Sequence, residues 1–109
     1  MTEQSNRPHP IVVAVSAMWN IPAAEVTRAP RTDKAVFAQQ DAMVLLRLTR
    51  GAEYRGLARI FGVDQGAARD AVKAGIARIR RDTEHSARLM RLMRLMLLIA
   101  APPRNASIA

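Results

Sequence analysis

The chain has 109 residues, half of them hydrophobic and 4% aromatic, and it contains no cysteine. This length allows one small domain with a single core, the hydrophobic content excludes a disordered polypeptide, and the lack of cysteine excludes disulfides and cysteine-based zinc sites. The formal net charge is +8, from 17 basic and nine acidic residues. We therefore expect a polyanionic partner, most commonly nucleic acid, with a solvated arginine-rich surface as the simpler alternative.

The predicted elements begin with a flexible arm over residues 1–9, which is polar and unlike a secretory signal. A helix is predicted from about Pro10 to Trp19, because proline is tolerated at a first helical position and apolar residues recur on one face. A short helix over residues 23–27 follows, with Val26 facing inward. Residues 28–34 then form a basic loop.

The next predicted helix runs from about Lys34 to Arg50, with Thr32 or Asp33 as its N-cap and Gly51 as its left-handed C-terminal residue. Much of its circumference is apolar, so we expect it to be central and buried on more than one side.

Residues 53–81 predict a helix, a tight turn at Gly62 and a second helix capped by Asp64. Ala58 is small at the point where the second helix would cross the first. The predicted inner face of the second helix consists of Ala68, Val72, Gly75 or Ile76, and Ile79. A helix-turn-helix of this kind places its second helix in the DNA major groove, although helical pairs in other proteins share part of the pattern.

Three side chains of the second helix are candidate DNA contacts. We expect Gln65 to bond an adenine edge, Arg69 to reach a guanine or a phosphate, and Lys73 to meet a phosphate. Gly66 and Ala67 offer only close approach. The alternative for all of them is an ordinary solvated helix face. In the basic loop, Arg31 is expected to enter a minor groove, and a plain surface loop is the alternative.

Residues 82–101 predict a C-terminal amphipathic helix that ends at two prolines, and a loose tail over 102–109. Arginines recur on one side at positions 88, 91 and 94. The apolar side chains predicted to bind a partner are Leu89, Met90, Leu92, Met93, Met96 and Leu97. Three alternatives stay open for this helix: folding back onto the domain, pairing with a partner or a second copy, and lying on an anionic membrane.

The stretch from Ile11 to Ile79 resembles the C-terminal DNA-binding domain (domain IV) of the bacterial replication initiator DnaA, which has a Trp-repressor-like helix-turn-helix. The resemblance rests on the 28–34 loop and on Val13, Ala14, Trp19, Asn20, Ile21, Glu25, Val26, Gln40, Ala42, Met43, Leu45, Leu48, Thr49, Leu57, Ala58, Phe61 and Gly62. In that family the basic loop enters the minor groove and the second motif helix reads the major groove.

The resemblance implies roles for individual positions. Arg31 matches a minor-groove arginine, Gln40 a residue near the phosphates, and Arg47 a basic backbone contact. Together with the residue-based interpretation, the predicted DNA-binding set is Arg28, Arg31, Lys34, Gln40, Arg47, Arg50, Gln65, Arg69 and Lys73.

The chain departs from this family at two places that carry function. The family opens its recognition helix with Asp-His-Thr-Thr, whereas residues 64–67 here read Asp-Gln-Gly-Ala, and Gln39 replaces a family arginine. No phosphate-binding Walker loop exists, so the chain is not itself an initiator. A closer parallel is the DnaA-like half of the gene-transfer-agent transcription activators of alphaproteobacteria, which also contain a sigma-factor-like half.

No catalytic or metal-binding set is evident, because His9 and His85 pair with no cysteine or matched carboxylate. We therefore predict an all-α, non-enzymatic protein of five to six helices, without cofactor or metal. The predicted function is a cytoplasmic, nucleoid-associated transcription regulator that binds double-stranded DNA. It would activate transcription together with a partner, such as a second regulator, a sigma-like subunit or RNA polymerase, or as a homodimer. No interaction with a membrane is predicted. The alternative is a protein-interaction module on a helix-turn-helix scaffold.

Overall fold

The computed structural model describes residues 8–100, with side chains up to Leu98. Within this range the chain forms six α-helices and no strand, which confirms the predicted all-α class. The helices are α2 (Pro10–Trp19), α3 (Ala23–Val26), α4 (Asp33–Arg50), α5 (Tyr54–Phe61), α6 (Gln65–Arg81) and α7 (Thr83–Ala100). The predicted arm over 1–9 lies outside the described residues except for its last two, and the predicted tail over 102–109 lies wholly outside them.

Local capping interactions set the helix boundaries as predicted. The Thr32 hydroxyl accepts the Ala35 N–H at 3.1 Å, so Thr32 rather than Asp33 caps α4. The Asp64 carboxylate accepts the Ala67 N–H at 2.7 Å and caps α6. Gly51 and Gly62 end α4 and α5 with φ of 63° and 65°, in the left-handed region that glycine adopts without steric cost.

The turn at Gly62 makes a prediction about stability. A Cβ at this position meets no other group within 4 Å, so only the left-handed backbone opposes a side chain there. We expect Gly62→Ala to lower the free energy of unfolding by about 1–2 kcal/mol, measured by chemical denaturation. Gly56→Ala is the matched control, since Gly56 lies inside α5 with equally open surroundings. That variant should be stabilised by about 0.5–1 kcal/mol, and equal losses in both variants would contradict the account.

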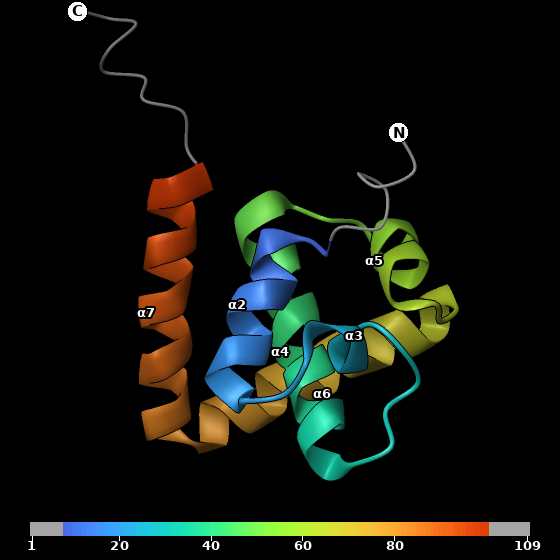
Figure 1. Cartoon of the computed structure of the whole chain (residues 1–109), viewed down its shortest axis with the longest axis horizontal. Helices are drawn as coiled ribbons and strands as arrows, with labels where there is room; N and C mark the ends of the chain where they lie inside the picture. The colour runs from blue at the N-terminus through green and yellow to red at the C-terminus, as the bar shows by residue number, and fades with distance from the viewer. Residues whose placement is uncertain (1–7, 101–109) are drawn as a thin grey trace, which may run out of the picture.

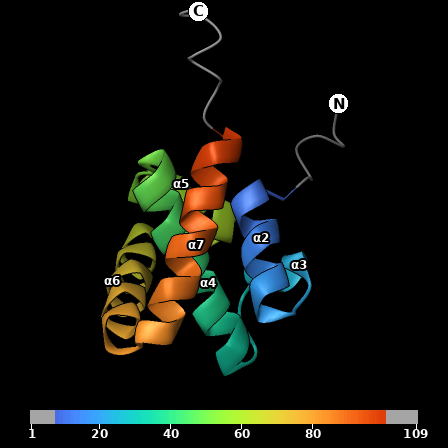
Figure 2. The ribbon, with the colours of Figure 1, turned by 90° about the vertical axis from the view of Figure 1, so that its left-hand side faces the viewer.

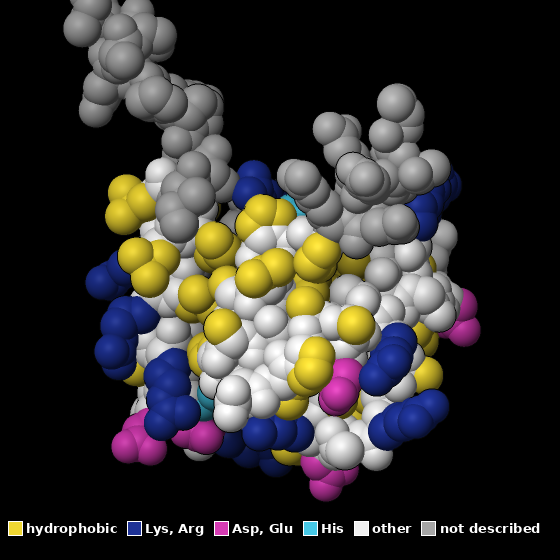
Figure 3. Space-filling model, in the orientation of Figure 1, with side chains coloured by type: hydrophobic (Ala, Val, Ile, Leu, Met, Phe, Trp, Pro, Cys, Tyr) yellow, Lys and Arg dark blue, Asp and Glu magenta, His cyan; other side chains and the backbone are white. Residues whose placement is uncertain are grey.

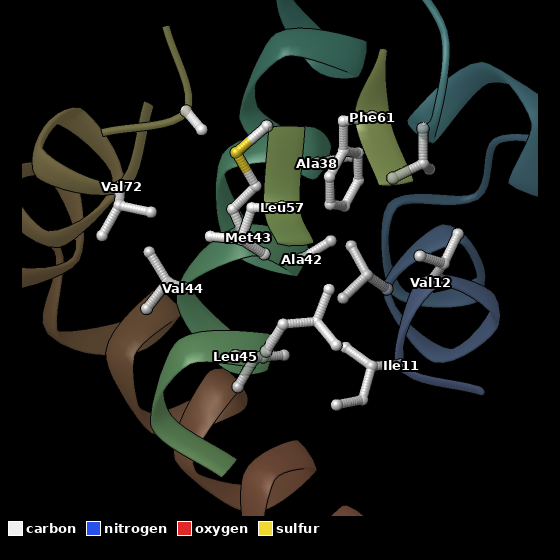
Figure 4. Close-up of a cluster of buried hydrophobic side chains, with 14 of the residues drawn as sticks. Ile11, Val12, Ala38, Ala42, Met43, Val44, Leu45, Leu57, Phe61 and Val72 are labelled. Atoms are coloured by element: carbon white, nitrogen blue, oxygen red, sulfur yellow. The ribbon is translucent and has the colours of Figure 1, made fainter. Parts of the chain in front are cut away.

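Helix α4 is the centre of the fold. It packs against α2, α3, α6 and α7, and nine of its residues are buried, including Ala42 and Leu45 at 0% and 2% exposure. Figure 4 shows Met43, Val44 and Leu45 between side chains of α2 on one side and Val72 of α6 on the other. The prediction that this helix is buried on more than one side is confirmed.

Helix α7 folds back onto the domain and packs against α4 and α6 (Figures 1 and 2). Leu89 and Met96 are buried in the core of their own chain. Their prediction as partner-binding residues is therefore wrong, because the helix uses them for its own docking. Leu92 and Met93 are half-buried, whereas Met90 and Leu97 are exposed. Within the part of the chain that the structure describes, no helix has the length and apolar content to cross a membrane.

His9 caps α2, since its Nδ1 accepts the Ile11 N–H at 3.0 Å. Only an unprotonated ring nitrogen accepts a hydrogen bond. Burial, and then the positive charge of Arg50, lower the pKa of His9 below its ordinary value of 6.5. Between pH 6.5 and the lowered pKa of the folded state, His9 therefore binds a proton more readily in the unfolded chain than in the folded chain.

The resulting prediction concerns pH. The contribution of His9 to stability is fully present above pH 6.5 and is lost as the pH falls toward the lowered pKa of the folded state. His9→Asn retains a capping acceptor that does not titrate. Denaturation across this window should show a shallower decline in the variant than in the natural chain. Parallel curves would refute a contribution from His9.

Candidate nucleic-acid interface

Helices α5 and α6 pack closely on each other around the turn at Gly62. Leu57 and Phe61 of α5 are buried, and so are Ala68 and Val72 of α6. Gly75 completes the buried face of α6, with Ile76 and Ile79 half-buried beside it. The predicted inner face is thus confirmed, and the opposite face of α6 is left for solvent or a ligand.

The exposed side of α6 carries the predicted reading residues. Gln65, Arg69 and Lys73 are all exposed, and among the described residues no ion pair neutralises Arg69 or Lys73. Gly66 and Ala67 are exposed as well and present no bulk between this face and an approaching surface. A basic helix face with small residues allows close contact with a groove of DNA.

Tyr54, at the start of α5, brings two predicted DNA-binding arginines together. The Arg47 guanidinium lies 4.3 Å from the centroid of the Tyr54 ring, and that of Arg69 lies 5.4 Å from it. Arg47 also donates to the Ala52 carbonyl at 2.8 Å. Arg47 is therefore half-buried and stabilises the connection between α4 and α5, in addition to any contact with a phosphate.

The basic loop is exposed at Arg28, Arg31 and Lys34. Its backbone is held by Gln39, whose buried amide donates to the carbonyls of Val26 and Arg28 at 2.9 and 3.2 Å. The sequence interpretation treated Gln39 only as a lost arginine. Its glutamine amide, which can donate two hydrogen bonds, was the signal for a positioning role.

Gln40 contacts α6 through its side-chain amide. Its Oε1 accepts from Arg78 Nε and Nη2 at 3.3 and 3.2 Å, and its side chain is half-buried against α6. The amide oxygen of Gln40 is therefore engaged inside the protein, whereas a contact with a phosphate would use the amide N–H donors. The prediction of Gln40 as a DNA-binding residue stays a prediction.

A buried polar cluster lies beneath α6, where the sequence interpretation found none. Asp41 is fully buried and accepts three hydrogen bonds, from Arg78 at 2.9 Å, Trp19 Nε1 at 2.8 Å and His85 Nε2 at 2.7 Å. The Arg78 guanidinium also lies 4.6 Å from the centroid of the Phe37 ring. The cluster joins α2, α4, α6 and α7 at one point.

This cluster corrects two statements made from the sequence. The inner face predicted for the second motif helix did not include Arg78, and His85 was expected to lack a matched carboxylate, yet both bind Asp41. Every buried side-chain nitrogen and oxygen in the described residues has a partner, so the cluster is satisfied internally. The described residues include no group of three acidic, histidine or cysteine side chains placed to hold a metal ion.

Most of the predicted DNA contacts lie away from α7, whereas Arg47 and Arg50 lie near the end of α4. The loop after α3, helix α5 and the start of α6 all lie on the right of Figure 1, with α7 on the left. Figure 3 shows Lys and Arg side chains around the edge of this view, with Asp and Glu side chains among them at the lower left, at the bottom and on the right. Among the described residues, the only arginines in ion pairs are Arg28, with Glu25 at 3.9 Å, and Arg78. No family model, curated protein or solved structure matches the chain.

Proposed function

We propose that this protein is a sequence-specific DNA-binding transcription regulator that acts with a partner protein. The observation that carries the proposal is the two-sided character of α6. Its inner side is packed on α4 and α5, while its outer side presents Gln65, Arg69 and Lys73 to solvent. This is the arrangement that a recognition helix of a helix-turn-helix requires.

Affinity in this proposal comes mainly from phosphates. Arg31, Lys34 and Arg50 are exposed and have no ion pair among the described residues, so they are available to displace condensed counterions from DNA. A net charge of +8 on 109 residues favours the encounter at long range.

Base selectivity rests on fewer groups. Gln65 is the first residue of α6 and Arg69 lies one turn further, so both occupy the half of the helix that enters a groove first. The Tyr54 ring lies beneath Arg69, which limits the orientations that its guanidinium adopts. Asp70 is suited to accept from a cytosine amino group or to orient Arg69. We infer a modest base preference, for which a partner bound to the same DNA compensates.

The family resemblance supports the same assignment and adds the biological setting. A chain built like the initiator's DNA-binding domain, but without its box-reading residues, fits a nucleoid-associated regulator in the cytoplasm. Activation with a sigma-like subunit or RNA polymerase follows from the parallel with gene-transfer-agent activators. The proposal includes no catalysis, cofactor or metal.

The test is binding of the full chain to random-sequence duplex DNA, titrated at two salt concentrations, followed by sequencing of the retained duplexes. We expect affinity to fall steeply with salt and the retained pool to share a motif. Salt-sensitive binding without a shared motif would mean that the partner protein supplies the sequence specificity. No binding at low salt would overturn the proposal.

Two substitutions separate readout from phosphate binding. We expect Arg69→Ala to reduce the preference for the selected motif by about tenfold, and Arg31→Ala to weaken all sequences alike while lowering the salt slope by about 0.9. Arg47→Ala should also weaken all sequences, but with a loss of stability because its bond to Ala52 disappears. Arg91→Ala on α7 is the matched control and should leave binding unchanged. If Arg69→Ala weakened binding to all sequences equally, the assignment of Arg69 to base readout would be wrong.

A further inference from the structure

A second surface, formed by α2 and α7 and away from the loop after α3, helix α5 and the start of α6, is built differently. Between α2 and α7 lies a shallow groove of about 250 Å³, lined by Met18 of α2 and by Arg88, Arg91, Leu92 and Leu95 of α7. Leu95 is 55% exposed, although the helix that carries it is already docked on the core. Figure 3 shows apolar side chains spread over α2 and α7, with Lys and Arg side chains along the outer edge of α7.

We propose that this groove binds an acidic amphipathic helix of a partner protein. Leucine and methionine side chains that line a groove accept the apolar anchors that recur at i, i+3, i+4 and i+7 of a bound helix. The lining residues 88–95 span about 10 Å, or roughly two helical turns, which is the distance between anchors at i and i+7 of a bound helix. Arg88 and Arg91 lie on adjacent turns and can each pair with an acidic residue beside the anchors.

Charge selects this occupant over the others. The described part of α7 carries Arg88, Arg91 and Arg94 but only one acidic residue, Glu84, at its start. A second copy in the groove would bring another basic α7 beside the first, so homodimerisation through this face is opposed by like charge. Phosphates of DNA would pair with the arginines but gain nothing from Leu92 and Leu95.

The groove also differs from a mere gap left by poor packing. The inward side of α7 is fully used, since Leu89 and Met96 are buried and His85 bonds to Asp41. Leu95, which lines the groove, lies on another side of the same helix and is 55% exposed. Its removal from water would strengthen association without any rearrangement of the domain.

The test uses three labelled synthetic peptides of about 18 residues, or five helical turns. The first has leucine at i, i+3, i+4 and i+7 and glutamate at exposed positions; the second replaces glutamate with lysine; the third scrambles the first. Fluorescence anisotropy with the full chain should show binding of the first peptide alone. Binding of the scrambled or lysine peptide with equal affinity, or binding of none, would overturn the proposal.

Substitutions in the chain locate the site. We expect Leu95→Glu to weaken the acidic peptide at least about tenfold, and Arg91→Glu to reverse the preference toward the lysine peptide. Leu48→Glu is the matched control, because Leu48 is also exposed, at 64%, but lies on α4 outside this groove. An equal loss from Leu48→Glu would overturn the assignment.

Three further measurements distinguish other occupants. Sedimentation should show a monomer, and anionic phosphatidylglycerol vesicles should not compete with the acidic peptide. A dimer abolished by Leu95→Glu, or vesicles that displace the peptide, would overturn the proposal. Duplex binding should be the same for Leu95→Glu and the natural chain, so a failure here is separable from a failure of the proposed DNA binding.

Discussion

Asp41→Asn is expected to lower the free energy of unfolding by about 3–5 kcal/mol, the largest effect predicted for this protein. The carboxylate accepts from Arg78, Trp19 and His85, and it is fully buried. An amide has one oxygen and adds donors of its own, so it leaves buried donors facing donors and Arg78 without its counter-charge. The chain has one tryptophan, and it is part of the cluster, so Trp19 fluorescence during denaturation reports the change directly.

A double-mutant cycle tests whether the loss comes from the ion pair. Arg78→Met removes the guanidinium while retaining a long apolar side chain, and alone it should also destabilise, since Asp41 then keeps only two donors. The double variant should be more stable than the sum of the single losses predicts, by about 1–3 kcal/mol. Strict additivity would show that Arg78 and Asp41 act independently, contrary to their 2.9 Å contact.

The Asp41→Asn variant also tests how α7 is attached to the rest of the domain. His85 attaches the start of α7 to Asp41 of the central helix. Loss of that acceptor should raise amide hydrogen exchange in α7 before it does so in α4. Exchange that rises first in α5 would place the weakest part of the fold elsewhere.

The features that were predictable from sequence are local ones. Thr32, Gly51, Gly62 and Asp64 act within one turn of their own position, so the residue type and its neighbours suffice to assign a cap. The helix periods likewise indicated which faces of the helices were apolar. These two kinds of information reproduced the described helices closely.

The polar cluster was not predictable in this way. Trp19, Arg78 and His85 are separated from Asp41 by 22, 37 and 44 positions, and no local pattern connects residues so far apart. One signal was available: an aspartate within a helix whose circumference is otherwise largely apolar requires buried partners. The helical period alone does not decide whether Arg78 and His85 point outward to solvent or inward to Asp41.

The candidate site was predicted unevenly for the same reason. Exposure of Gln65, Arg69 and Lys73 follows from the period of α6, once its inner face is known. The engagement of Gln40 by Arg78 depends on the crossing of α4 and α6, which no single helix encodes. The docking of α7 by Leu89 and Met96 depends likewise on which side meets the core.

That crossing is set by Gly75, and its substitution is the second large effect that we expect. A Cβ at Gly75 would lie 2.9 Å from Val44 Cγ2, 3.2 Å from Gln40 Cβ and 3.4 Å from the Gln40 carbonyl oxygen. Val44 is buried at 3% exposure and has little room to move. Gly75→Val should therefore destabilise the protein by about 3 kcal/mol, although glycine is itself a poor helix former, because α6 must move away from α4.

A matched control and a rescue decide whether close packing is the cause. Ala74→Val, one residue earlier on the exposed side of α6, introduces the same side chain and should cost no more than about 0.7 kcal/mol. Val44→Ala in the Gly75→Val background removes the nearest opposing atoms and should recover about 1 kcal/mol, although alone it destabilises. If α6 is the reading helix, Gly75→Val should also reduce selection of the DNA motif more than Ala74→Val does, measured below the unfolding transition. A Gly75→Val variant as stable as Ala74→Val would show that the contact of α4 with α6 tolerates a side chain at position 75. Close packing at Gly75 would then not be what sets the orientation of α6 and of its proposed reading face.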